Sequence, residues 1–365
     1  MEAQVKAALA TRDYKQVSRL LKQWQTSEPQ SPLLRLYAAQ MQEKTNRLEA
    51  AEKNYLKLLK QTPSGKLMSQ ARAGLQRIEQ QRKQAKAAAL SEAKQTEGAD
   101  ELAILAIASP AEQNRKEAIA GVAKVFNLDA YSARLKIPPS GFRIHRLGAW
   151  GEVTYYADQL KQVKVPTLSN KVCDIQALQT FQICYFEALT PQPTIVCKSA
   201  DNQLGKISFD WSEVSQRVSG QLPIFEQVVD IGNWGKTIHK EKIQDYAQVV
   251  DLHLAGRQIV LRLCDRLYQY RKGQEQKGQE QKGTDLAKGP ELNSRIQWNQ
   301  LLSTLEHAIK APERSDFKRF GKGALEFINL LPLIHPNLDI DRRAPSDWDL
   351  AFHLYSSLCY LNSRR

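Results

Sequence analysis

The stretch "TRDYKQVSRLLKQWQTSEPQ" (residues 11–30) recurs 34 positions later as "TNRLEAAEKNYLKLLKQTPS" (residues 45–64). The matched apolar positions are Tyr14, Val17, Leu21 and Trp24 in the first copy and Leu48, Ala51, Tyr55 and Leu58 in the second. Spacings of three, four and three place each set on one face of a helix, and a second apolar stripe precedes each set. The pattern predicts pairs of helices whose shared faces are buried by stacking against neighbouring pairs.

This period resembles that of the tetratricopeptide repeat family. Ala51, Tyr55 and Pro63 match the family's small residue, aromatic residue and closing proline, and Val17, Leu21 and Pro29 match them less well. The glycine that the family places before the second helix is absent, because Arg12 and Asn46 stand there. Residues 67–90 predict a further helix that caps the array, and a polar, Ala-rich stretch then predicts a domain boundary near residue 98.

The resemblance implies a protein-binding scaffold with no chemistry of its own, which binds through a concave surface lined by the first helix of each repeat. The family's groove positions correspond here to Lys6, Tyr37, Gln40, Lys44 and Arg77. Lysine and arginine at such a surface suit an acidic peptide or a carboxylate terminus. The alternative is that the short array packs against the rest of the chain, so that the groove is filled in cis.

The charge of the chain also favours acidic partners. The 365 residues include 52 Lys plus Arg against 39 Asp plus Glu, a formal net charge of +13. Residues 1–98 hold 18 of the basic residues and nine of the acidic ones, a net of +9. Such an excess is typical of a docking surface for an acidic protein, nucleic acid or anionic membrane, and equally of solvated helix faces.

The compartment is predicted from the cysteines and the termini. The five cysteines include no CxxC pair, which indicates reduced and mostly buried thiols in a cytosolic-type compartment. The first residues lack the layout of a signal peptide, and no apolar run approaches the roughly 18 residues that span a bilayer. We therefore expect a soluble cytoplasmic protein, with a peripheral position at a membrane surface as the alternative.

Residues 99–175 predict a small module with the order β-α-α-β-α-β. The expected strands are 101–108, 141–148 and 165–172, and the expected helices are 109–126, 129–137 and 150–163. Ser109, Pro110 and Glu112 have the spacing of a capping box that starts the first of these helices. The order is similar to that of the Clp-protease adaptor and of the C-terminal domain of the ribosomal stalk protein, a fold analogy that carries no function.

Residues 176–365 predict a mainly antiparallel β domain with C-terminal helices, so that the whole chain is multidomain, α plus α+β. Strands are expected at 181–189, 194–200 and 204–211, and a hairpin at 245–271 turns about Ala255 and Gly256. The stretch from Asp210 is expected to begin as a helix. A sheet followed by a helix at 291–309 is the order of a pleckstrin-homology-like domain. Residues 272–289, which include "KGQEQKGQEQKG", predict a flexible loop, and two more helices are expected after residue 314.

The sequence shows no constellation for chemistry. The Gly321-Lys322-Gly323 stretch follows no predicted strand and lacks the rest of a phosphate loop. The six histidines are scattered, without a pair three or four residues apart, and we expect each to be on the surface or half-buried. Asp339 and Asp341 form only a weak candidate for a cation site. We expect a protein without enzymatic activity, cofactor or metal ion.

Two further interpretations complete the prediction. The alternative function is binding to nucleic acid or to an anionic membrane surface, because the stretch with Arg143, Arg146, Trp150 and Tyr156 combines basic and aromatic residues. Strong salt dependence of binding would favour this alternative.

The whole layout, including "FDWSEVSQRVSGQLPIFEQVVD" (209–230), resembles uncharacterised multidomain proteins of cyanobacterial type. That resemblance implies a photosynthetic host and an assembly factor for a pigment–protein complex. The leading interpretation is a non-enzymatic adaptor whose basic groove binds an acidic protein segment.

Overall fold

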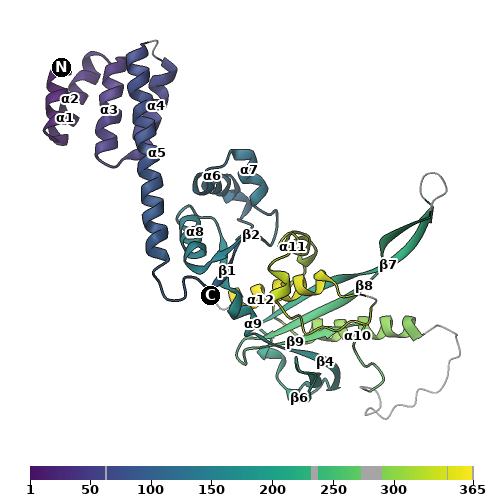
Figure 1. Cartoon of the computed structure of the whole chain (residues 1–365). Coiled ribbons are helices and arrows are strands. Elements are labelled where there is room, and N and C mark those ends of the chain that lie inside the picture. The colour runs from purple at the N-terminus through teal and green to yellow at the C-terminus, as the bar shows by residue number, and fades with distance from the viewer. Residues whose placement is uncertain (62–63, 232–236, 273–289, 343, 364–365) are drawn as a thin grey trace. The chain divides into compact units, whose positions relative to one another are not determined.

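The computed structural model describes residues 1–61, 64–231, 237–272, 290–342 and 344–363. They form two compact units, residues 1–92 and residues 93–365. The first unit is helical, and the second combines two β-sheets with helices (Figure 1). The expected multidomain organisation, a helical unit followed by β-sheets with helices, is therefore confirmed at this coarse level. Among the described residues, no helix is both long enough and apolar enough to cross a membrane.

The first unit consists of five helices whose turns repeat at the same 34-residue step. They are α1 (Glu2–Ala10), α2 (Tyr14–Ser27), α3 (Pro32–Lys44), α4 (Leu48–Gln61) and α5 (Gly65–Ala93). Arg12 and Asn46, which precede α2 and α4, both adopt positive φ, of 57° and 58°. This left-handed conformation is one that glycine adopts most readily. The two copies thus have the same turn conformation although neither has a glycine there. Pro63, the closing proline of the second copy, lies outside the described residues.

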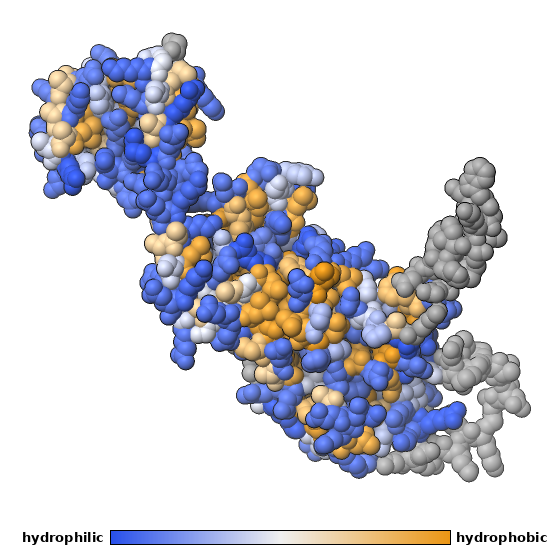
Figure 2. Space-filling view, in the orientation of Figure 1, coloured by the Kyte–Doolittle hydropathy of each residue, from blue (hydrophilic) through white to orange (hydrophobic). Residues whose placement is uncertain are grey.

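Two apolar clusters hold the first unit together, and α3 contributes to both. One cluster joins α1, α2 and α3 around Val17, Leu21 and Trp24. The other joins α3, α4 and α5 around Tyr55 and Leu58. These are the residues of the repeated stripe, so the predicted buried faces are confirmed. The second half of α5 buries nothing of this kind, and its visible surface is hydrophilic (Figure 2).

The second unit begins with a three-stranded antiparallel sheet in the order β2-β1-β3, covered on one face by helices. Its strands are β1 (Leu102–Ala108), β2 (Phe142–Ala149) and β3 (Thr167–Lys171), and the covering helices are α6 (Arg115–Phe126), α7 (Ala130–Lys136) and α8 (Trp150–Gln162). The short helix α9 (Val172–Gln176) follows β3 and packs on the opposite face. The predicted order β-α-α-β-α-β is confirmed, but the capping by Ser109 is wrong. The Ser109 hydroxyl instead donates to the carbonyl of Pro139 at 3.0 Å, and α6 starts after a separate 3-10 turn at Glu112–Asn114.

A seven-stranded sheet follows, in the order β10-β7-β8-β9-β4-β5-β6. The strands are β4 (Gln179–Ala188), β5 (Thr194–Lys198), β6 (Leu204–Ser208), β7 (Gln216–Ile231), β8 (Thr237–Leu254), β9 (Ile259–Cys264) and β10 (Glu313–Arg314). The sheet is mixed, because β4 pairs with β9, and β10 with β7, in parallel. The expected hairpin about Ala255 and Gly256 is present as β8 and β9.

Two of the predicted elements in this region are shorter than expected. The Asp210–Glu213 capping box is present, but the helix that it starts is one 3-10 turn, Trp211–Glu213, before β7 begins. The strand predicted for 257–271 ends at Cys264. The amides of Leu267 and Tyr268 turn back to the Cys264 carbonyl, which closes the chain into a turn. Residues 273–289 of the predicted flexible loop lie outside the described residues.

The two sheets of the second unit share a core. Helix α10 (Pro290–Ala308) packs on one face of the seven-stranded sheet through Trp298 and Leu305. Helices α11 (Phe317–Ala324) and α12 (Asp347–Ser363) lie on the other face (Figure 1). The apolar cluster beneath them joins residues of β7 and β8 with Ile104 and Ile144 of the small sheet. Residues 99–175 and 176–365, which were predicted as two regions without deciding between one domain and two, therefore lie within one unit.

Candidate functional site

The helical unit carries a groove between α1, α3 and the start of α5. Its volume is about 490 Å³. The side chains that line it form an apolar floor with a polar rim: Glu2, Lys6, Leu9, Leu33, Leu36, Tyr37, Gln40, Ser64, Lys66, Leu67 and Gln70. The Tyr37 hydroxyl donates to the Glu2 carboxylate at 3.1 Å, and burial together with this carboxylate raises the pKa of Tyr37. We call this surface the helical groove.

Three of the five predicted binding residues meet in this groove. Lys6, Tyr37 and Gln40 line it, with the Lys6 side chain exposed. Lys44 is exposed at the end of α3 and Arg77 lies further along α5, and neither lines the groove. The structure therefore brings together the positions on α1 and on the first part of α3, and leaves the two outer basic residues apart.

Arg77 has a partner within its own unit. Its guanidinium binds both carboxylate oxygens of Glu43, with nitrogen–oxygen distances of 2.7 and 2.9 Å. The hydroxyl of the buried Tyr55 also donates to Glu43, at 2.7 Å. Burial by itself raises the pKa of the Glu43 carboxyl, but these donors outweigh it and hold the pKa below its usual value. Arg77 thus serves to neutralise a buried acid between α3 and α5.

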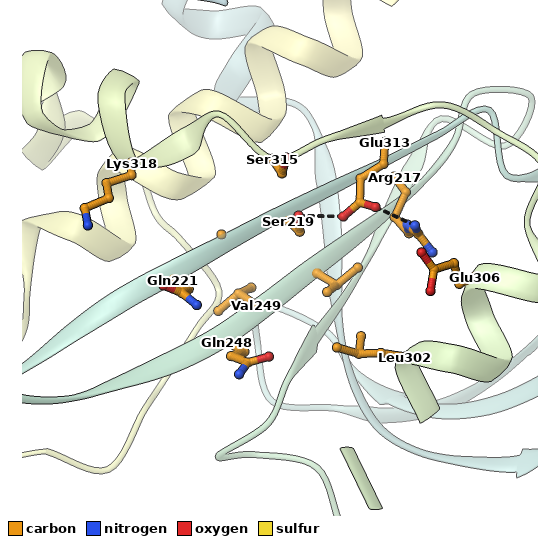
Figure 3. Close-up of a pocket in the computed structure, with 12 residues that line it drawn as sticks. Arg217, Ser219, Gln221, Gln248, Val249, Leu302, Glu306, Glu313, Ser315 and Lys318 are labelled. Atoms are coloured by element: carbon orange, nitrogen blue, oxygen red, sulfur yellow. Dashed lines mark hydrogen bonds and ion pairs between the residues drawn. The ribbon is translucent and has the colours of Figure 1, made fainter. Parts of the chain in front are cut away.

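A second hollow, the sheet pocket, lies in the larger unit between α10, β7 and β10 (Figure 3). Its volume is about 400 Å³. The Glu313 carboxylate binds the guanidinium of Arg217 and accepts a hydrogen bond of 2.7 Å from the Ser219 hydroxyl. Gln221, Gln248, Glu306, Ser315 and Lys318 complete its polar lining. The pocket therefore offers both donors and acceptors beside the apolar side chains of Val249, Val250 and Leu302.

A cluster of charged side chains is sealed between α12 and the seven-stranded sheet. Asp251 and Arg262, from β8 and β9, form a bidentate ion pair in which both side chains are fully buried. Burial raises the pKa of Asp251, but the Arg262 guanidinium outweighs it and keeps that pKa low. Arg262 also donates to the Pro336 carbonyl and lies 3.3 Å from Nδ1 of His353.

Two histidines in this cluster correct the prediction that every histidine is on the surface or half-buried. His253 is fully buried and His353 is 4% exposed. His253 Nε2 lies 2.9 Å from the Ser356 hydroxyl. Burial, together with the Arg262 charge, lowers the pKa of His253 to about 4 and that of His353 to about 3. Both rings are therefore neutral near pH 7, and the cluster has no solvent access for a ligand.

The described residues contain no cluster of side chains suited to bind a metal ion, and most of the thiols are buried. No group of three or more His, Cys, Asp or Glu side chains in the described part of the chain is placed to hold a metal ion. Four of the five cysteines are buried, as expected. Burial raises the pKa of Cys264 to about 12 and that of Cys197 to about 11, so these thiols stay protonated.

Most of the residues that line the helical groove, and all of the sheet pocket, were not predicted from the sequence. Lys66, Leu67 and Gln70 line the groove because α5 begins at Gly65, near the end of the predicted second repeat. The sheet pocket joins residues from β7 and β10, about a hundred positions apart, and no local pattern links them. The buried pair had a visible signal, since Asp251 and Arg262 interrupt the apolar runs "VVDLHL" and "IVLRLC".

The chain was also compared with models of known protein families, with curated proteins and with solved structures. None of the three comparisons finds a match.

Proposed function

We propose that this protein is a non-enzymatic adaptor or assembly factor whose helical groove binds an acidic segment of a partner protein. The observation that carries the proposal is that Lys6 and Lys66 face one groove above a floor of leucines. On this proposal the helices of residues 1–92 are a short tetratricopeptide-like array. The proposal includes the role that the cyanobacterial-type resemblance implies, the assembly of a pigment–protein complex in a photosynthetic host.

The chemistry of the groove supports a peptide rather than a small metabolite. Leu9, Leu33 and Leu67 can receive apolar side chains of an extended segment, which supplies most of the affinity in peptide recognition. Lys6 and Lys66 can pair with flanking carboxylates of the segment. Glu2 favours a segment that also places a lysine or arginine beside it. The net charge of +9 over residues 1–98 adds long-range attraction for an acidic partner.

The experiment is peptide selection from a displayed library on the intact chain at physiological salt, followed by affinity measurement on enriched peptides. We expect selected peptides to combine Asp or Glu with Leu or an aromatic residue. The charge-reversal variant Lys6→Glu/Lys66→Glu should bind them at least tenfold more weakly, because two charge-assisted contacts become repulsive.

The matched control is Lys15→Glu/Lys57→Glu, which changes the same charge on exposed positions of α2 and α4 that do not line the groove. It should keep the affinity within about twofold, since exposed charges away from a contact contribute little. Equal losses in the two variants would show that overall charge, not the groove, attracts the peptide, and would overturn the proposal.

The alternative function predicts a different outcome. A pull-down with the intact chain and with residues 99–365, with and without nuclease, should yield discrete proteins that resist nuclease and moderate salt and require residues 1–98. If nucleic acid or lipid comes down instead and salt releases it, basic charge alone explains binding, and the adaptor proposal is wrong. A truncation that keeps the same partners as the intact chain contradicts it equally.

A further inference from the structure

A small hollow with an excess of positive charge lies where the loop before β2 meets α11. It is lined by Ser140, Asp316, Lys318, Arg319 and Lys322 and has a volume of about 360 Å³. We call it the lysine hollow. Its three cationic side chains are exposed, and none of them has an ion-pair partner within the described residues. Lys318 and Lys322 are four residues apart on α11, a spacing at which like charges repel each other.

The loop that carries Ser140 is held in place by backbone contacts. The amide of Ser109 donates to the Gly141 carbonyl at 2.8 Å, and its hydroxyl donates to the Pro139 carbonyl. The Arg319 guanidinium donates to the Ser140 hydroxyl oxygen. The Ser140 hydroxyl also carries one proton of its own, which it can donate to a ligand. The loop thus places a hydroxyl group beside the cations of α11.

Asp316 does not cancel the charge of the hollow. Its Oδ1 accepts a hydrogen bond of 2.5 Å from the Tyr355 hydroxyl. Its Oδ2 lies against Gly141, where a Cβ atom would approach within 1.6 Å, so only glycine fits beside it. The carboxylate is therefore fixed between α12 and the loop. Against three cations it leaves the lining with a formal charge of +2.

We propose that the lysine hollow binds the phosphate monoester of a small soluble molecule. A phosphate monoester carries a charge of about −1.5 to −2 at pH 7 and presents three strong acceptor oxygens. This matches the charge of the hollow and its ammonium, guanidinium and hydroxyl donors. A carboxylate or a phosphodiester carries a single negative charge and leaves the two lysines partly uncompensated.

The neighbouring sheet pocket indicates the rest of the ligand. Lys318 lines both hollows, so a molecule with its phosphate in the lysine hollow can extend toward Ser315 and Gln221 (Figure 3). Glu306 can accept hydrogen bonds from hydroxyl groups. In the sheet pocket Arg217 is paired with Glu313. Glu306 balances Lys318 there, so the lining has no net positive charge, and this favours the lysine hollow for the phosphate. Neither lining contains an aromatic side chain on which a base could stack. The ligand class is therefore a phosphorylated polyol or sugar rather than a nucleotide.

The test is calorimetric titration of the full chain with glycerol 3-phosphate and, separately, with dimethyl phosphate, at low ionic strength. We expect saturable one-site binding of the monoester and at least tenfold weaker binding of the diester, because the second charge is lost. Lys318→Ala/Lys322→Ala should weaken monoester binding by about tenfold or more. Lys310→Ala, an exposed lysine that lines neither hollow, should leave it unchanged.

Three results would overturn the proposal: no saturable binding of glycerol 3-phosphate, equal affinity in the double-lysine variant, or equal affinity for dimethyl phosphate. A fourth arm uses vesicles that contain phosphatidic acid, a lipid with a phosphate monoester. Binding to these vesicles without binding to glycerol 3-phosphate would assign the hollow to a membrane and would also overturn it. All variants lie outside residues 1–92, so this test is independent of the adaptor proposal.

Discussion

At the scale of single residues, the buried Asp251–Arg262 pair is the place where loss of one partner should cost the most. Both side chains have no solvent exposure, so neither charge is hydrated. Taking one partner away leaves the other charge buried and unpaired, which is far more costly than losing the pair altogether. The pair is held from α12 by His353 and from the loop by the Pro336 carbonyl.

We therefore expect Arg262→Leu to lower the free energy of unfolding by about 3–5 kcal/mol, as measured by urea denaturation. The double variant Asp251→Leu/Arg262→Leu should recover much of this loss, because no unpaired charge remains. Arg82→Ala removes the exposed ion pair with Glu52 in the first unit and should cost at most about 1 kcal/mol. A double variant no more stable than Arg262→Leu would contradict this account.

The two buried histidines predict how stability depends on pH. In the unfolded chain a histidine takes up a proton near pH 6.5, whereas the pKa of His253 is lowered to about 4 and that of His353 to about 3. Between those values the unfolded state binds more protons than the folded state, so stability falls as pH decreases. Urea midpoints should drop from pH 7 to pH 5, and His353→Gln should flatten this dependence. A midpoint that rises toward pH 5 would refute it.

At the scale of elements, α5 packs against α4 through a glycine. A Cβ atom at Gly74 would lie 2.4 Å from the ring of Tyr55, whose hydroxyl binds Glu43. In a free helix, alanine is more favourable than glycine by about 1 kcal/mol. Here the close approach of α5 to α4 reverses that preference, because the ring has no room to move without breaking its hydrogen bond.

Gly74→Ala should therefore destabilise the first unit by about 1–3 kcal/mol in thermal or urea unfolding, the usual cost of overpacking. Gly65→Ala, on the same helix but with nothing within 4 Å of the added atom, should be neutral or stabilising by up to about 1 kcal/mol. If both substitutions have the same sign, the contact with Tyr55 does not determine the packing of α5.

Local sequence patterns predicted some helices and strands correctly and others wrongly. The apolar stripes of α2 and α4 were predictable because periodicity within one helix encodes its buried face. The strand β7 was not predicted, because the Asp210–Glu213 capping box is a genuine helix signal. Pairing of β7 with β8 over its full length overrides that signal after one turn. The loop at Pro139 likewise competes for the Ser109 hydroxyl and displaces the start of α6.

At the scale of the whole molecule, residues 93–365 form one unit because α12 and α11 cover both sheets. Phe142 of β2 stacks on Tyr355 of α12, with ring centroids 5.3 Å apart, and meets Phe320 of α11 at 5.1 Å. Asn362 of α12 binds Asn170 of β3 at 2.8 Å. The small sheet thus buries one face against the last fifty residues of the chain.

It follows that residues 93–178 should not fold alone, because one face of the small sheet would be exposed, whereas residues 93–365 should unfold in a single cooperative transition. Circular dichroism with urea titration of the two fragments checks this. A fragment 93–178 with a sharp transition of its own would show that the small module is an independent domain and that the shared core is secondary.

The sequence by itself determined the helical repeat, the strands and helices of the module at 99–175, and the buried faces of α2 and α4. Each of these follows from interactions between residues a few positions apart, which a periodic pattern records. Tertiary structure alone decided that Lys66 joins Lys6 in the helical groove, that Arg217 meets Glu313, and that α12 seals Asp251 and Arg262 beneath it. Such contacts join segments far apart in the chain, and their free energy comes from burial and charge pairing that exist only once the segments are packed together.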